Sequence, residues 1–245
     1  VFLVVFLHLL GFTMGGPILP ALREHFAIEV AQTGLITSAF PLGMFVAVFV
    51  FPALSDRIGR KPVLIVSYLG VGMGFLLQAM AIKWNLPFHL FLALRTASGM
   101  FAGASTVVKA YIADMTDSES LPTVMAYREA AGTLAFIVGP TLGGLLFSAT
   151  GGCLELVVAC CGFTSLSAAM LVLWRLRACA PARRLQAPRA KEAKDAAAKA
   201  ADAEPEGRSL AWLTPVITMM AVSFAYNFGQ AFFDSFLPIF CAEEF

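Results

Sequence analysis

The chain has 245 residues, of which 59% are hydrophobic and only 13% are charged, and its formal net charge is +1. Soluble domains carry about 25% charged residues. Outside residues 175–208 the deficit of charged residues is larger still, because these residues alone hold 14 of the 33 charged side chains. This composition excludes an ordinary soluble enzyme, a disordered chain and a nucleic-acid-binding domain. We therefore expect a membrane protein without enzymatic activity.

Seven apolar segments are long enough to cross a bilayer, for which a helix needs about 20 mostly apolar residues. The first segment is too long for a signal peptide and has no basic start. We predict an all-α membrane protein with a six-helix bundle at 1–174, a charged linker at 175–209 and the first helix of an incomplete second bundle at 210–245. The predicted spans are 1–22, 31–53, 62–82, 87–113, 122–149, 153–174 and 210–240.

The distribution of Lys and Arg between the loops predicts the orientation of the chain. Three cationic residues follow the second span and nine more lie within 175–208, whereas only Arg23 and Lys83 lie on the opposite side. We therefore expect the N-terminus and the 175–209 linker to be cytoplasmic. Within the linker, the Ala-rich run 190–203 favours a semi-rigid helical spacer.

The connection between the second and third spans, residues 52–62, reads Pro-Ala-Leu-Ser-Asp-Arg-Ile-Gly-Arg-Lys-Pro. Gly59 permits a tight reversal of the chain, and Pro62 suits the first position of the next helix. Asp56 lies among three cations, where it can pair locally or cap a helix N-terminus. The alternative is that the cations only hold the loop in the cytoplasm.

This connection resembles the signature of the major facilitator superfamily, Gly-x-Leu-Ala-Asp-Arg-x-Gly-Arg-Lys, with Pro52 and Ser55 in place of the first Gly and the Ala. The Gly-Pro-Thr-Leu-Gly-Gly run at 139–144 is similar to the signature of proton-driven antiporters in that family. Residues 94–103 are similar to the family's Arg-x-x-x-Gly pattern, and residues 11–20 and 110–117 resemble bacterial tetracycline/proton antiporters.

The resemblance implies a cytoplasmic charge network that latches one side of a transporter closed. Its matching members are Asp56, Arg60 and Asp114, and the loop motif also includes Arg57, Gly59 and Lys61. In the family, the loop Asp also meets a helix of the second half. The resemblance therefore implies that the missing C-terminal half is required.

Small residues recur every four positions in the fifth span and form a ridge that lets two membrane helices approach closely. Pro140 removes a backbone donor there and is expected to loosen the helix. The ridge is either a static packing seam or an interface that slides and seals during transport, and the resemblance favours the second. Its residues are Ala131, Ala135, Gly139 and Gly143, with Gly144 completing the motif.

Arg95 lies well inside the fourth span, where an arginine costs about 2.5–3.5 kcal/mol to insert. Together with Ser98, Ala102, Ser105 and Lys109 it follows helical spacing along one largely polar face. We predict that this face lines a cavity in which Arg95 holds an anionic substrate group or acts on a nearby acid. The alternatives are a structural pair with a carboxylate for Arg95 and a position at the interface for Lys109.

The seventh span carries a second polar face, which includes Ser223 together with Asn227, Gln230 and Asp234. It either lines a wet cavity or makes hydrogen bonds between helices, and Asp234 is alternatively a surface acid. The candidates for a proton carrier are few. His8 is a carrier or a satisfied core histidine, Glu129 more simply pairs with Arg128, and the carrier is alternatively in the missing half.

We interpret the chain as part of a secondary active transporter of a small organic solute, most simply a proton-coupled antiporter working by alternating access in the bilayer. A facilitator or symporter of the same superfamily is the close alternative. A seven-span receptor conflicts with the predicted orientation, and a non-transporting membrane fragment is the remaining class. The five cysteines have no paired spacing of the zinc or redox type, so no metal or cofactor is expected.

Overall fold

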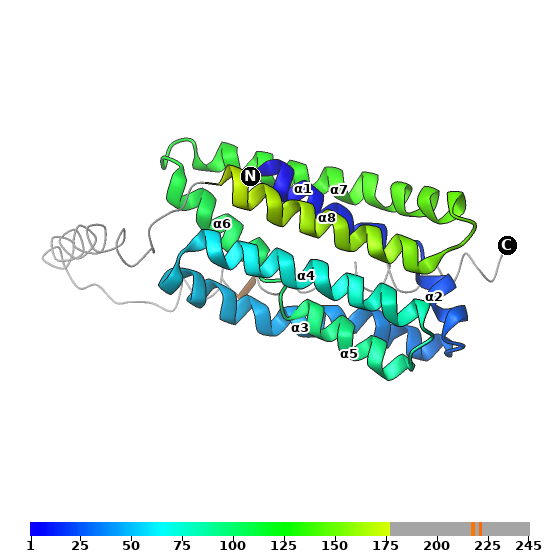
Figure 1. Ribbon diagram of the computed structural model, residues 1–245. Helices are drawn as coiled ribbons and strands as arrows, with labels where there is room; N and C mark the ends of the chain where they lie inside the picture. Colours follow the sequence, from blue (N-terminus) through cyan, green and yellow to red (C-terminus); the bar gives the residue numbers. More distant parts are fainter. Residues whose placement is uncertain (177–216, 219–220, 222–245) are drawn as a thin grey trace, which may run out of the picture. The chain divides into compact units, whose positions relative to one another are not determined.

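The computed structural model describes residues 1–176 together with residues 217, 218 and 221. The chain divides into two compact units, Val1–Leu185 and Gln186–Phe245. Nearly all described residues belong to the first unit, which is a helical bundle without strands in its described part (Figure 1). Its helices are α1 (Phe2–Met14), α2 (Leu19–His25), α3 (Val30–Ile58), α4 (Arg60–Lys83), α5 (Phe88–Gly99), α6 (Ala104–Met115), α7 (Leu121–Ala149) and α8 (Leu154–Arg175).

Five segments of the described chain are long and apolar enough to cross a membrane, namely most of α3, all of α4, α5 with α6, α7 and α8. The bent pair of α1 and α2 makes a sixth if it counts as one span. A total of seven spans is not confirmed, because all but three residues of the predicted span 210–240 lie outside the described part of the chain.

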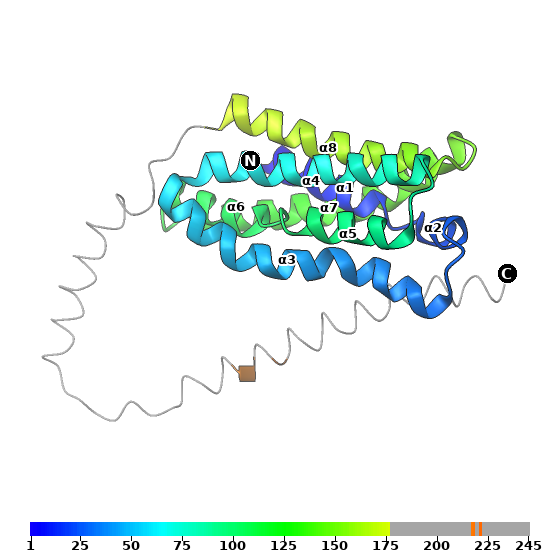
Figure 2. The same ribbon diagram turned by 60° about the horizontal axis from the view of Figure 1, so that its bottom comes forward.

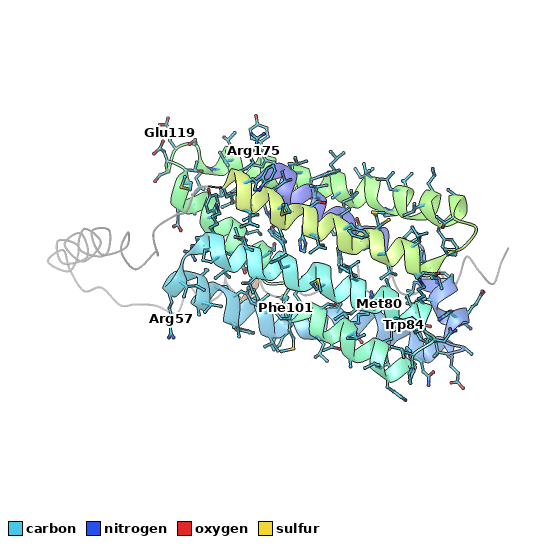
Figure 3. All side chains as sticks on the ribbon, in the orientation of Figure 1. Arg57, Met80, Trp84, Phe101, Glu119 and Arg175 are labelled. Atoms are coloured by element: carbon cyan, nitrogen blue, oxygen red, sulfur yellow. The ribbon has the colours of Figure 1, made fainter. Side chains whose placement is uncertain are left out.

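Two of the predicted spans are interrupted. The first bends by 47° between α1 and α2, at Gly15-Gly16-Pro17, where proline lacks a backbone donor. The fourth breaks at residues 100–103, where Ala102 N bonds to Gly99 O at 2.8 Å and tightens the turn. Ser67 of α4 donates a hydrogen bond to the carbonyl of Phe101, which is labelled in Figure 3, so α4 fixes this break.

One local expectation about proline is corrected. Gly59 reverses the chain with φ +102°, as its freedom at positive φ allows, but α4 already begins at Arg60. Pro62 is therefore the third helical residue, where its missing N–H is still one of the unpaired donors of a helix start. Pro140 does not interrupt α7, which runs unbroken from Leu121 to Ala149.

The helices pack as neighbouring pairs (Figures 1 and 2). α1 lies between α7 and α8, α4 packs along α8 and against α5 and α6, and α3 runs beside α5. Figure 3 shows Arg57, Glu119 and Arg175 at one end of the bundle, called here the Arg57 end, and Trp84 towards the other, the Trp84 end. Separate apolar clusters fill the two ends, with Leu22, Ile82 and Phe91 in one cluster and Val63, Leu64 and Val172 in the other.

Candidate functional site

A buried guanidinium joins three helices at the Arg57 end. Arg60 opens α4 with a side chain that is only 6% exposed, and its Nη1 lies 2.5 Å from Oδ1 of Asp56. Its Nε donates to Oδ2 of Asp114 near the end of α6 at 2.9 Å, and Nη1 also donates to Oγ of Ser55 at 2.6 Å. Such charge-assisted hydrogen bonds are stronger than neutral ones, so Arg60 ties together the ends of α3, α4 and α6.

The two carboxylates of this cluster differ in exposure. The Asp114 side chain is 21% exposed and the Asp56 side chain 51%. Two carboxylates around one guanidinium leave a surplus negative charge, which Asp56 presents at the surface of the bundle end.

The other two cations of the loop lie apart from this cluster. Arg57 points away from the bundle (Figure 3). Lys61 instead donates through Nζ to the carbonyl of Leu173 at 2.8 Å, near the end of α8, where a cation is favourable to the helix dipole.

Arg95 of α5 sits in an uncharged polar network. Its Nε donates to the carbonyl of Ile36 on α3 at 2.8 Å, and its Nη1 donates to Oε1 of Gln78 on α4 at 3.3 Å. Gln78 is fully buried and donates to Oγ of Ser98 at 3.0 Å. None of the ion pairs among the described residues includes Arg95. Its charge therefore has no carboxylate partner within that part of the chain.

The remaining part of the predicted polar face has other neighbours. Beyond the break, Ser105 accepts a hydrogen bond from Nη2 of Arg128 at 2.7 Å. Lys109 Nζ lies 3.3 Å from Oε1 of Glu129, and Arg128 Nη1 lies 2.5 Å from the same oxygen. The predicted polar face is thus divided into two groups of polar residues, one packed against α3 and α4 and the other against α7. Ala102 is buried at the break between them.

The small-residue ridge of α7 packs against α1 of the same bundle. Thr13 of α1 donates to the carbonyl of Ala135 at 3.0 Å. A Cβ at Gly139 would overlap the Thr13 side chain, and one at Gly143 would overlap the carbonyl oxygen of Met14. The neighbouring Gly144 has no such contact, and Ala131 is partly buried.

His8 lies inside the bundle with its ring edge-on to Tyr68 of α4 at 4.8 Å between ring centres. Its Nδ1 is buried and has no hydrogen-bond partner within residues 1–176. The predicted cavity residues Asn227, Gln230 and Asp234 fall outside the described residues.

Two residues of these sites, Gln78 and Thr13, were not predicted, because the pattern of a single helix does not show which polar residues bond to a neighbouring helix. Arg128 was expected only as the partner of Glu129, although it is a cation inside an apolar span as Arg95 is.

Comparison with known proteins gives one family. The family model described as Major Facilitator Superfamily matches residues 1–245. The chain is similar to the major facilitator-type transporter psiT2 of Psilocybe cyanescens, with 35% identity over 114 residues, which cover 46% of this chain and 21% of that protein. It is also similar to the class C tetracycline resistance protein of Escherichia coli, with 32% identity over 146 residues, 58% of this chain and 36% of that protein. It is similar as well to major facilitator superfamily domain-containing protein 10 of Bos taurus, with 31% identity over 188 residues, which cover 65% of this chain and 40% of that protein. The chain thus spans less than half the length of each of these relatives.

Proposed function

The chain belongs to the major facilitator superfamily, and on this premise we propose that it forms one bundle of a secondary active transporter for a small organic solute. It is an integral, multi-pass membrane protein of a transporter family. Relatives named for tetracycline resistance and for bacillibactin export support a role in export. In this proposal a second six-helix bundle completes the pathway, and the two rock around a site near the middle of the bilayer.

The observation that carries the proposal is the Arg60 cluster at the Arg57 end. Desolvation makes a buried ion pair a weak source of stability, so the cluster is better suited to a contact that forms and breaks. Asp56 is half exposed although its partner Arg60 is buried, and its carboxylate is accessible to a residue of another helix. We place this end in the cytoplasm, in line with its cations, and assign Asp56 to a latch against the second bundle.

The coupling ion in this proposal is the proton. His8 supports it, because its buried Nδ1 has no hydrogen-bond partner within residues 1–176, and histidine is a side chain that can take up and release a proton. Arg95 supports a substrate site in the bundle, because its charge is held by a carbonyl and an amide and is left available to an anionic group.

The test is reconstitution of the full-length gene product into vesicles with an imposed pH gradient and a panel of organic solutes that includes tetracycline. Replacing Asp56 by Asn should lower proton-driven solute flux by roughly tenfold, a change of about 1.4 kcal/mol in the barrier, with membrane insertion unchanged. Asp117→Asn is the matched control, because Asp117 is an exposed acid at the same end of the bundle, and it should transport normally.

Three results would contradict parts of this proposal. Unchanged kinetics in Asp56→Asn would remove the latch. Solute flux that neither needs nor moves protons would indicate a facilitator in place of an antiporter. Absence of flux of any tested solute under any gradient would reject the transporter itself.

A further inference from the structure

The apolar spans of the described bundle carry an excess of positive charge. Away from the terminal turns, the apolar spans within residues 1–176 contain three cations and one carboxylate, which are Arg95, Lys109, Arg128 and Glu129. Charges at this depth are expensive and act strongly on one another, because little water screens them. A surplus of cations there favours an anion and repels a cation.

Arg128 is the least exposed member of this set, with a side chain that is 6% exposed. Two of its nitrogens are used, Nη1 by Glu129 and Nη2 by Ser105. Its Nε is buried without a hydrogen-bond partner among the described residues. A guanidinium offers a planar fork that suits a carboxylate, and here part of that fork is unoccupied.

Glu129 does not balance the two cations beside it. Arg128 Nη1 and Lys109 Nζ both approach the same oxygen, Oε1, at 2.5 and 3.3 Å. The side chains of Lys109 and Glu129 are 51% and 59% exposed, so one side of this group is open. One further carboxylate would bring Arg128, Lys109 and Glu129 to electrical neutrality.

The bundle is also short of hydrogen-bond partners for its buried nitrogens. Besides Nε of Arg128, Nδ1 of His8, whose ring packs against Tyr68, is buried without a hydrogen-bond partner among the described residues. A closed structural ion pair would use one carboxylate for one cation and leave no such nitrogen. The arrangement therefore fits a binding subsite better than a static pair.

We propose that Arg128 and Lys109 bind the carboxylate of an organic anion, and that Glu129 occupies these cations when the anion is absent. The proposal rests on the transport function above and narrows its substrate class to carboxylates. Glu129 acts as an internal competitor, because it must share or release the two cations when the anion enters.

Binding is tested on the purified full-length gene product in detergent, by the shift in thermal unfolding temperature with benzoate at constant ionic strength. Tetraphenylphosphonium is the cationic comparison. Because a ligand that binds the folded state stabilises it, benzoate should raise the unfolding temperature of the wild type and tetraphenylphosphonium should not.

The variants are chosen to change the affinity for benzoate in opposite directions. Arg128→Gln and Lys109→Gln should weaken benzoate binding at least tenfold, whereas Glu129→Gln should strengthen it by removing the competitor. Lys83→Gln is the control, because Lys83 is an exposed cation at the Trp84 end, and it should bind like the wild type. Lys109 and Glu129 are both exposed, so these two variants remain informative if Arg128→Gln fails to fold.

The subsite is overturned if benzoate gives no shift, if Lys109→Gln binds it as the wild type does, or if Glu129→Gln weakens binding. Because this assay needs no flux, its result is separate from the transport test. If the variants change benzoate affinity as expected but no solute flux is found, the transport function is rejected and the subsite is kept. If flux is found but benzoate does not bind, the subsite is rejected and the transport function is kept.

Discussion

Replacing Gly143 by Ala tests how tightly α7 packs against α1. The new Cβ would overlap the carbonyl oxygen of Met14 and lie 3.0 Å from its Cα and carbonyl carbon, whereas ordinary contact begins at 3.4 Å. These are backbone atoms, which cannot rotate away as a side chain can. The two helices must therefore separate until this overlap is relieved.

The expected cost is set by this separation. Overpacking a close interface costs about 1–3 kcal/mol, and the movement also stretches the hydrogen bond from Thr13 to the Ala135 carbonyl, now 3.0 Å, which is worth about 0.6 kcal/mol in a membrane protein. Alanine recovers up to about 1 kcal/mol as a better helix former than glycine. The net loss for Gly143→Ala is therefore about 1–2 kcal/mol.

Gly144→Ala is the matched control, because it makes the same chemical change one residue along the same helix and its new Cβ meets nothing within 4 Å. Both variants are unfolded by titrating mixed micelles with SDS, and helix content is followed by circular dichroism. The SDS fraction at the unfolding midpoint of Gly144→Ala should equal or slightly exceed that of the wild type, and that of Gly143→Ala should be lower. Equal midpoints for the two variants would refute the close α1–α7 contact.

Three further changes are tested with the same titration. Replacing Asp114 by Asn removes the less exposed carboxylate of Arg60 and should lower the free energy of unfolding by about 1–2 kcal/mol; an unchanged midpoint would show that this pair adds nothing. Gln78→Leu keeps the bulk but removes the acceptor for Nη1 of Arg95, so a loss of about 1–3 kcal/mol is expected, and wild-type stability would contradict the buried network. His8→Phe keeps a ring beside Tyr68 and removes a buried nitrogen that has no hydrogen-bond partner among the described residues. It should raise stability by about 1 kcal/mol while lowering proton-driven flux in vesicles. Wild-type flux in that variant would exclude His8 as the proton carrier.

Most helix boundaries could be predicted from the sequence, because Gly, Pro and charged residues mark them. The predicted spans 62–82, 122–149 and 153–174 correspond to α4, α7 and α8 with shifts of two residues or fewer at each end. The breaks in the first and fourth spans were missed although Gly and Pro lie at the first of them. The residues at 15–17 and 100–103 carry no charge, so each span was taken as one continuous apolar segment.

The partners of the site residues were harder to predict than the residues themselves. Helical spacing identifies the face on which a polar residue lies, but it does not identify the helix opposite that face. Arg95 was expected to meet a cavity or a carboxylate, and it meets the carbonyl of Ile36 and the amide of Gln78. The local sequence allowed a pairing of Asp56 with a nearby cation, but the contact of Arg60 with Asp114 could be anticipated only from the family resemblance, since the two lie 54 residues apart.

The break at residues 100–103 divides the fourth span into two helices, α5 and α6. Its first half is anchored to α3 and α4 by Arg95, and its second half to α7 by Ser105 and Lys109. A continuous helix would transmit a tilt of α7 directly to Arg95. Because Ser67 of α4 holds the turn at residues 100–103 in place, a tilt of α7 that moves the second half of the span need not move Arg95.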